Sequence, residues 1–182
     1  LTGAWLERVI RQIKKVSKLA VTLSLGERSL DDLTRWRKAG ADRYLLRFET
    51  SDRKLFDRIH PPASVPLPDR IEQLHTLREL GYEVGSGIMI GFPGQTCETA
   101  ADDLLLFQKL DLDMIGVGPF VPHPDTPLGR EPAKYALPSD EQVPATDVMT
   151  FKVLALARLV CPRANIPSTT ALATINKESG RE

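Results

Sequence analysis

Short apolar runs alternate with longer segments of helical periodicity along this chain, and this alternation restricts the possible folds more than any other feature. The strand-like runs are residues 19–25, 43–50, 83–90, 113–119 and a last one entered through 165–170. Helical patterns occupy residues 6–16, 29–40, 51–59, 69–80, 97–110 and 149–160. Because the connections are long enough for crossovers between parallel strands, the pattern predicts a parallel α/β protein.

Right-handed crossovers in series favour a TIM-type (β/α)8 barrel, although the pattern alone leaves an open sheet possible. The chain begins on Leu1 rather than Met, inside a helical pattern, so we interpret residues 1–182 as a single incomplete barrel domain. Residues 60–68 contain four prolines and are predicted not to be helix interior. Residues 129–144 are predicted to be irregular.

Charge and cysteine content exclude several classes of protein. Lys+Arg and Asp+Glu both number 24, so no net charge attracts nucleic acid or an anionic membrane. No apolar run approaches the ~20 residues of a membrane span, and the first residues do not resemble a secretory signal. Cys97 and Cys161 have neither metal-ligand spacing nor a disulfide pattern. Free thiols favour a cytoplasmic location.

The run Arg43-Tyr-Leu-Leu-Arg-Phe-Glu-Thr50 carries opposite charges at its carboxyl end. Side chains alternate across a strand, so Arg47 and Glu49 are predicted to share one face. Charges at the end of a buried strand are costly unless they are paired or face a ligand. Ligands bind at this end of parallel strands, but a purely structural salt bridge is an equally open interpretation.

The other strand ends are also rich in small or hydroxyl-bearing residues. They carry Thr22 and Ser24; Gly87, Met89 and Gly91; Gly116, Gly118 and Pro119; and Ser168, Thr169 and Thr170. A single hydroxyl in a strand is explained by β-propensity. Five strand ends of the same character instead predict a polar ligand pocket at one rim.

Motifs for phosphate binding or hydrolysis are missing from the sequence. There is no Gly-x-Gly-x-x-Gly opening a helix and no Walker-type Gly-Lys-Ser/Thr. His60, His75 and His123 are scattered and suggest no nucleophile–base pair. No strand carries an inward lysine, which disfavours an aldolase-like barrel. The reactive group is therefore expected to come from a cofactor.

Four segments together resemble the HydE family, the radical S-adenosylmethionine (SAM) maturases of FeFe hydrogenase, which are related to biotin synthase and methylornithine synthase. They are residues 44–50, 86–96, 113–127 and 165–171. The turn Gly91-Phe-Pro-Gly-Gln-Thr96 is common to many radical enzymes, whereas Gly118-Pro-Phe-Val-Pro-His-Pro-Asp-Thr-Pro127 is much more specific. The resemblance implies that the chain holds about strands 3 to 7 of the eight in a radical SAM barrel.

The resemblance also implies roles for residues at the predicted rim. Glu49 would accept hydrogen bonds from the ribose or the methionine amine of SAM, and Arg70 would bind the methionine carboxylate. Taken alone, an arginine at a helix start is usually solvated. Further cofactor-binding residues would be Met89, Ser24 and Gly87. The substrate chamber would be lined by Thr22, Arg47, Thr169 and Thr170.

The implied activity is reductive cleavage of SAM to a 5′-deoxyadenosyl radical, which acts on a small sulfur-containing substrate during assembly of the FeFe-hydrogenase active-site cluster. The implied cofactors are SAM and a 4Fe–4S cluster. The implied partners are the small-molecule substrate, an electron donor such as ferredoxin or flavodoxin, and the other hydrogenase maturases.

The sequence departs from the family pattern in one respect: residues 1–182 lack the Cys-x-x-x-Cys-x-x-Cys loop that holds the cluster. We therefore assign no metal ligand and no catalytic residue within the chain, and we expect these residues alone to be inactive. Two alternatives stay open, namely an enzyme closer to biotin synthase or methylornithine synthase, and a barrel scaffold without catalysis.

Overall fold

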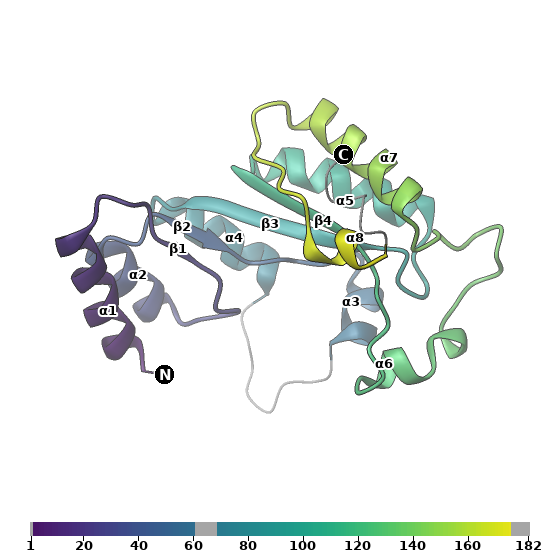
Figure 1. The fold of residues 1–182 in the computed structure, drawn as a ribbon, viewed down its shortest axis with the longest axis horizontal. Helices are drawn as coiled ribbons and strands as arrows, with labels where there is room; N and C mark the ends of the chain where they lie inside the picture. The colour runs from purple at the N-terminus through teal and green to yellow at the C-terminus, as the bar shows by residue number, and fades with distance from the viewer. Residues whose placement is uncertain (1, 61–68, 176–182) are drawn as a thin grey trace.

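The computed structural model describes residues 2–60 and 69–175 (Figure 1). Its centre is a parallel sheet in the order β1-β2-β3-β4. The strands are β1 (Thr22–Leu23), β2 (Arg43–Leu45), β3 (Glu83–Ile90) and β4 (Met114–Pro119). Each strand is followed by at least one helix before the next begins, so the predicted parallel α/β architecture is confirmed.

The six predicted helices lie close to their predicted positions, and the short elements at residues 127–130, 132–134 and 170–175 are additional. The helices are α1 (Gly3–Val16), α2 (Leu30–Ala39), α3 (Arg53–Ile59), α4 (Arg70–Glu79), α5 (Cys97–Lys109), α6 (Pro127–Arg130), α7 (Asp147–Val160) and α8 (Thr170–Ile175), with a 3-10 turn, η1 (Pro132–Lys134). The helix starts follow their capping residues: the Ser29 side chain accepts from the Asp32 N–H, and Thr96 forms a capping box with Thr99. Gly40 closes α2 at a φ of 112°.

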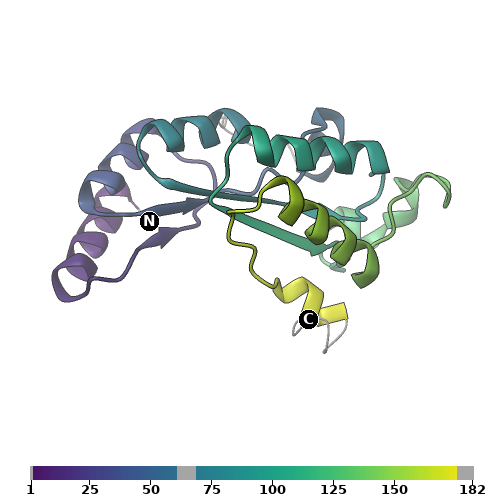
Figure 2. The ribbon, with the colours of Figure 1, turned by 90° about the horizontal axis from the view of Figure 1, so that it is seen from above.

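The core lies between the sheet and its helices. Viewed from above, the helices follow the outer side of the curved sheet, and α8 lies across from them on the inner side (Figure 2). Along residues 43–50 the even positions are buried and the odd positions are more exposed, as strand alternation predicts. Phe48 points outward and packs against Phe107 of α5, with ring centroids 5.5 Å apart.

The strand predicted over residues 43–50 keeps this alternation but loses its regular ladder after Leu45. Ser86 of β3 is the cause, since its hydroxyl donates to the Leu46 carbonyl at 2.8 Å and accepts from the Phe48 N–H at 3.2 Å. A buried side chain thus replaces backbone pairing between the two strands. Pairing resumes only at a bridge between Glu49 and Ile88.

Two predictions of local structure are corrected. The strand expected after residues 165–170 is a single bridge between Asn165 and Met114, followed by helix α8 from Thr170. Pro167 has no N–H to extend the ladder, and the Thr169 carbonyl accepts from the next turn of helix. The stretch expected to be irregular from residue 129 includes the end of α6 and η1. The prediction that residues 60–68 are not helix interior falls mainly on residues 61–68, which are outside the described part of the chain.

Candidate functional site at the carboxyl ends of the strands

The predicted rim is built on the inner side of the sheet by an arginine–glutamate pair. Arg47 binds Glu49 through two hydrogen bonds, from Nε to Oε1 at 3.0 Å and from Nη2 to Oε2 at 3.1 Å. Arg47 Nη2 also donates to the Ile88 carbonyl at 2.6 Å, which fixes the guanidinium across β3. The side chains are 29% and 15% exposed, so the pair is partly desolvated and rigid.

Glu49 adopts a backbone conformation that is unfavourable for its residue type. Its φ is +64°, and the Thr50 N–H donates to the Phe48 carbonyl across it at 2.8 Å. The Glu49 N–H donates to the Gly87 carbonyl at 3.0 Å. A non-glycine residue in this region costs about 1–3 kcal/mol and is typical of binding and catalytic sites.

Arg70 lies beside this pair and is largely buried, in contrast to the usual solvated arginine at a helix start. Its side chain is 17% exposed, and Nη1 donates to the Arg47 carbonyl at 2.7 Å. Nε donates to Glu27 Oε1 at 2.5 Å, and the guanidinium lies 5.3 Å from the Phe56 ring centre. Helix α4 thus connects the ends of β1 and β2.

Glu27 is a rim residue that our sequence analysis did not name, because it lies two residues beyond the predicted strand at 19–25. Burial is the largest single influence on the pKa of Glu27 and raises it, but the hydrogen bond and charge of Arg70, together with a backbone hydrogen bond, outweigh burial, so the pKa lies below its usual value. An acidic residue at the end of a strand, like Glu49, was the signal that could have revealed it. With Glu27 included, the rim contains two carboxylates and two guanidiniums.

Glycines keep the inner face of β3 and β4 free of bulk. Gly87 pairs with Gly116, and a Cβ atom at Gly87 would lie 2.1 Å from the Gly116 carbonyl oxygen. Met89 is half-buried two residues further on, and its carbonyl accepts from the buried Gln95 side chain at 3.1 Å. Gln95 also accepts from the Gly91 N–H at 2.6 Å, which holds the turn after β3.

The predicted threonines and serine lie at different heights along the sheet. The Thr169 hydroxyl donates to the Val117 carbonyl at 3.2 Å, on the inner side beside Gly118. Thr170 is exposed at the start of α8, and Ser24 is exposed just beyond β1. Thr22 is level with Arg43, six residues before Glu49, which corresponds to roughly 20 Å along an extended chain. The structure therefore brings Arg47, Glu49 and Arg70 together and places Thr22 elsewhere.

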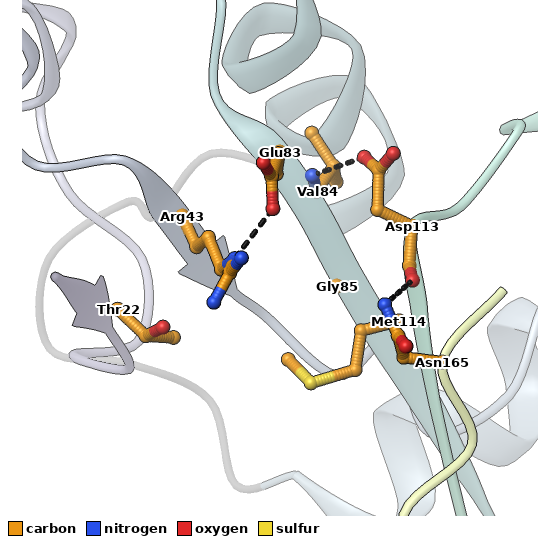
Figure 3. A pocket seen from close by; sticks show the side chains of 8 residues that line it. All are labelled: Thr22, Arg43, Glu83, Val84, Gly85, Asp113, Met114 and Asn165. Atoms are coloured by element: carbon orange, nitrogen blue, oxygen red, sulfur yellow. Dashed lines mark hydrogen bonds and ion pairs between the residues drawn. The ribbon is translucent and has the colours of Figure 1, made fainter. Parts of the chain in front are cut away.

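Thr22 borders a separate hollow of about 250 Å³ at the amino ends of the strands (Figure 3). Arg43 and Glu83 form an ion pair on one of its sides. On the other side, Asp113 accepts from the Val84 N–H at 2.7 Å. This hollow opens on the same face of the sheet as the rim but at the opposite end of the strands, so it forms a floor rather than part of the rim.

The described residues do not fit an iron–sulfur cluster. Within residues 2–60 and 69–175 there is no group of three or more His, Cys, Asp or Glu side chains placed to hold a metal ion. Cys97 is exposed at the start of α5, and Cys161 is buried at the end of α7. Across the same residues, no helix is both long and apolar enough to cross a membrane.

Comparison with solved structures identifies the fold. The chain superposes on methylornithine synthase PylB with a TM-score of 0.75 at 21% identity, covering 97% of this chain and 50% of PylB. The FeFe-hydrogenase maturase HydG gives a TM-score of 0.72 at 19% identity, covering 97% and 40%. Coproporphyrinogen III oxidase HemN from Escherichia coli, a radical SAM enzyme, gives 0.63 at 16% identity, covering 90% and 37%. The chain thus has the fold of part of each of these proteins, half or less of their length.

By sequence, the chain is a homologue of HydE. It is 45% identical to the FeFe hydrogenase maturase subunit HydE of Thermotoga maritima over 174 residues, which are 96% of this chain and 46% of that protein. A biotin synthase from Sulfurihydrogenibium is 29% identical over 157 residues, 86% of this chain and 43% of that enzyme. No protein-family model matches the chain. The resemblance to HydE is confirmed, and the chain spans about half the length of these relatives.

Proposed function

We propose that this chain is the middle part of a radical SAM enzyme of the HydE type. In this proposal the complete protein cleaves SAM reductively and acts on a small sulfur-containing substrate during assembly of the FeFe-hydrogenase active-site cluster. The observation that carries the proposal is the rim, where Arg47, Glu49 and Arg70 form one bonded unit in a chain 45% identical to HydE.

The donor set of the rim fits SAM, whose amino acid part and ribose need both a carboxylate and a guanidinium. Glu49 would accept hydrogen bonds from the ribose or the amine. The described contacts of Arg70 engage Nε and Nη1, which leaves Nη2 to bind the methionine carboxylate. Ser24, Gly87 and Met89 would complete the cofactor side of the rim, and the glycine would allow close approach of the ligand to β3.

The substrate would lie deeper along the inner face of the sheet. Arg47 at the rim and the Thr169 hydroxyl near Gly118 face this side, and with Thr170 they would bind a small carboxylate or anion. Thr22 would contribute at the floor, beside the hollow at the amino ends of the strands. When SAM is bound, the chemistry it supplies is a 5′-deoxyadenosyl radical, which the barrel would shield from water.

Partners and location follow from the same proposal. The 4Fe–4S cluster would be held by residues outside those described here, and an electron donor such as ferredoxin or flavodoxin would reduce it. The product would pass to the other hydrogenase maturases. Two free cysteines are consistent with our proposal that the protein works in the cytoplasm.

The proposal is tested with the complete protein after anaerobic cluster reconstitution. We expect it to produce 5′-deoxyadenosine from SAM and to support activation of an apo FeFe hydrogenase together with the other maturases. Conversion of dethiobiotin to biotin, without hydrogenase activation, would instead favour a biotin synthase. Absence of SAM binding and cleavage would favour a scaffold.

A further inference from the structure

Asp103 is a buried carboxylate that belongs to α5 and lies outside the rim. The residue is 0% exposed. Its Oδ1 accepts from the Ser51 N–H at 2.5 Å, from the Ser51 hydroxyl at 2.6 Å and, more weakly, from the Thr50 hydroxyl at 3.5 Å. Among the described residues, Oδ2 is buried without a hydrogen-bond partner. All the described hydrogen bonds of this carboxylate therefore go to one short segment of chain.

That segment immediately follows Glu49. Here the chain leaves the inner side of the sheet and turns outward into α3, whose N-cap is Asp52. The Thr50 hydroxyl accepts from the Asp52 N–H at 3.2 Å, so the turn is continuous with the helix start. Glu49 is thus held by the Gly87 carbonyl on its amino side and by the segment bound to Asp103 on its carboxyl side.

The fold gains little stability from this arrangement. Burial raises the pKa of Asp103 to about 6, although the hydrogen bonds from Ser51 act in the opposite direction. The ionised carboxylate therefore costs stability, and an apolar side chain would avoid that cost. What the carboxylate does provide is a fixed position for the turn that follows a residue at φ +64°. Without such restraint, a glutamate relaxes away from the left-handed region.

We propose that Asp103 is a positioning residue for SAM binding: through Ser51 and Thr50 it holds Glu49 in the backbone conformation that presents its carboxylate to Arg47 and the inner side of the sheet. This inference rests on the proposed function, since it concerns the affinity of the rim for SAM. According to this inference, a residue of α5 on the outer side of the sheet controls the geometry of the rim on the inner side.

The test uses the complete, reconstituted protein and three measurements: the dissociation constant for SAM by calorimetry, hydrogen exchange at residues 50–52, and the melting temperature. Asp103→Leu removes the acceptor, and we expect about tenfold weaker SAM binding and faster exchange. Asp103→Asn keeps an acceptor oxygen and should restore affinity close to wild type. Asp102→Asn, at the exposed neighbouring position, is the matched control and should change neither quantity.

The outcomes separate this inference from the proposed function. Unchanged SAM affinity and unchanged exchange in Asp103→Leu would overturn the positioning role while the wild-type protein still binds SAM. If Asp103→Leu does not fold, Ser51→Ala decides by the same criteria, because it removes one of the two short hydrogen bonds. Failure of the wild-type protein to bind SAM would overturn the proposed function and the inference with it.

Discussion

At the residue scale, the rim depends on Glu49, whose side chain and backbone are both constrained. Its carboxylate is bound twice by Arg47, and its N–H is bound by Gly87. These contacts offset the conformational cost of its positive φ, as is typical of strained residues in binding and catalytic sites. A site of this kind is sensitive to small chemical changes, because little rearrangement can compensate for them.

Replacing Glu49 by glutamine tests the role of the negative charge. In the complete protein, Glu49→Gln should weaken SAM binding by about tenfold or more, because hydrogen bonds to charged groups contribute about 1.5–3 kcal/mol. Calorimetry measures the change. Glu79→Gln, at an exposed position on α4, is the control and should bind SAM like the wild type.

Arg70 should show a mixed effect, because it binds Glu27 as well as the rim. Arg70→Ala is expected to weaken SAM binding by about tenfold and to lower stability, since it leaves a partly buried carboxylate unpaired. Arg70→Lys should recover only part of the affinity, because lysine lacks the planar fork. Arg53→Ala, at a 66% exposed side chain, is the control for calorimetry and thermal unfolding. Unchanged affinity in both Glu49→Gln and Arg70→Ala would contradict their assignment.

Asp103 gives the protein a defined pH dependence of stability. Its pKa is about 6 in the folded state and near 3.8 when unfolded, so the folded state binds more protons between these values. The contribution of protonated Asp103 to the free energy of unfolding is therefore fully present below pH 3.8 and is lost as the pH rises through about 6. Asp103→Asn should raise the free energy of unfolding at pH 8 by about 1–3 kcal/mol. Denaturant unfolding at pH 5 and pH 8 checks this, and an equal effect at both would contradict it.

At the element scale, β3 and β4 approach each other through two glycines that are not equivalent. A Cβ atom at Gly87 would lie 2.1 Å from the backbone of β4, whereas a Cβ atom at Gly116 would have its nearest neighbour, Arg47 Nη1, at 3.7 Å. Gly87→Ala should lower stability by about 1–3 kcal/mol or more, because the strands must separate. Gly116→Ala should be tolerated. Similar melting temperatures for the two variants would show that the strands are not this close.

Two threonines at the start of α8, Thr169 and Thr170, allow substrate binding to be tested separately from cofactor binding. Thr169→Val combined with Thr170→Val removes two hydroxyls from the proposed chamber but leaves Arg47, Glu49 and Arg70 intact. We expect SAM affinity to be preserved while turnover of the substrate falls. Thr174→Val, on the exposed side of the same helix, is the control. Equal losses of SAM binding and turnover would contradict the placement of these threonines.

At the scale of the whole molecule, the described chain is a curved sheet with helices outside and a largely uncovered inner side (Figure 2). That inner side carries Arg43, Arg47 and Glu49, which are polar groups that a closed barrel would enclose. We predict that the 182 residues alone do not cleave SAM after cluster reconstitution, because they lack the cysteine loop that would hold the reducing cluster. The open sheet would also leave the site accessible to water. Chromatographic detection of 5′-deoxyadenosine checks this, with the complete protein as control. Product formed by the 182 residues would contradict it.

The sequence by itself determined the parallel α/β architecture, the approximate boundaries of the six predicted helices and the faces of residues 43–50. These features follow from periodicity, capping residues and side-chain alternation, which are local properties of the chain. The resemblance to HydE also rested on motifs that are contiguous in sequence. The erroneous last strand arose because an apolar run with threonines does not by itself distinguish a strand from a short helix.

Only the tertiary structure decided which polar residues meet. Glu27 and Arg70 are 43 residues apart, and Asp103 and Ser51 are 52 apart, so no local pattern links them. The structure also separated Thr22 from the rim, since the height of a residue along the sheet depends on strand register. Local sequence sets the direction in which a side chain points, but its partners are set by how distant segments pack, and this is why the site could be predicted only in part.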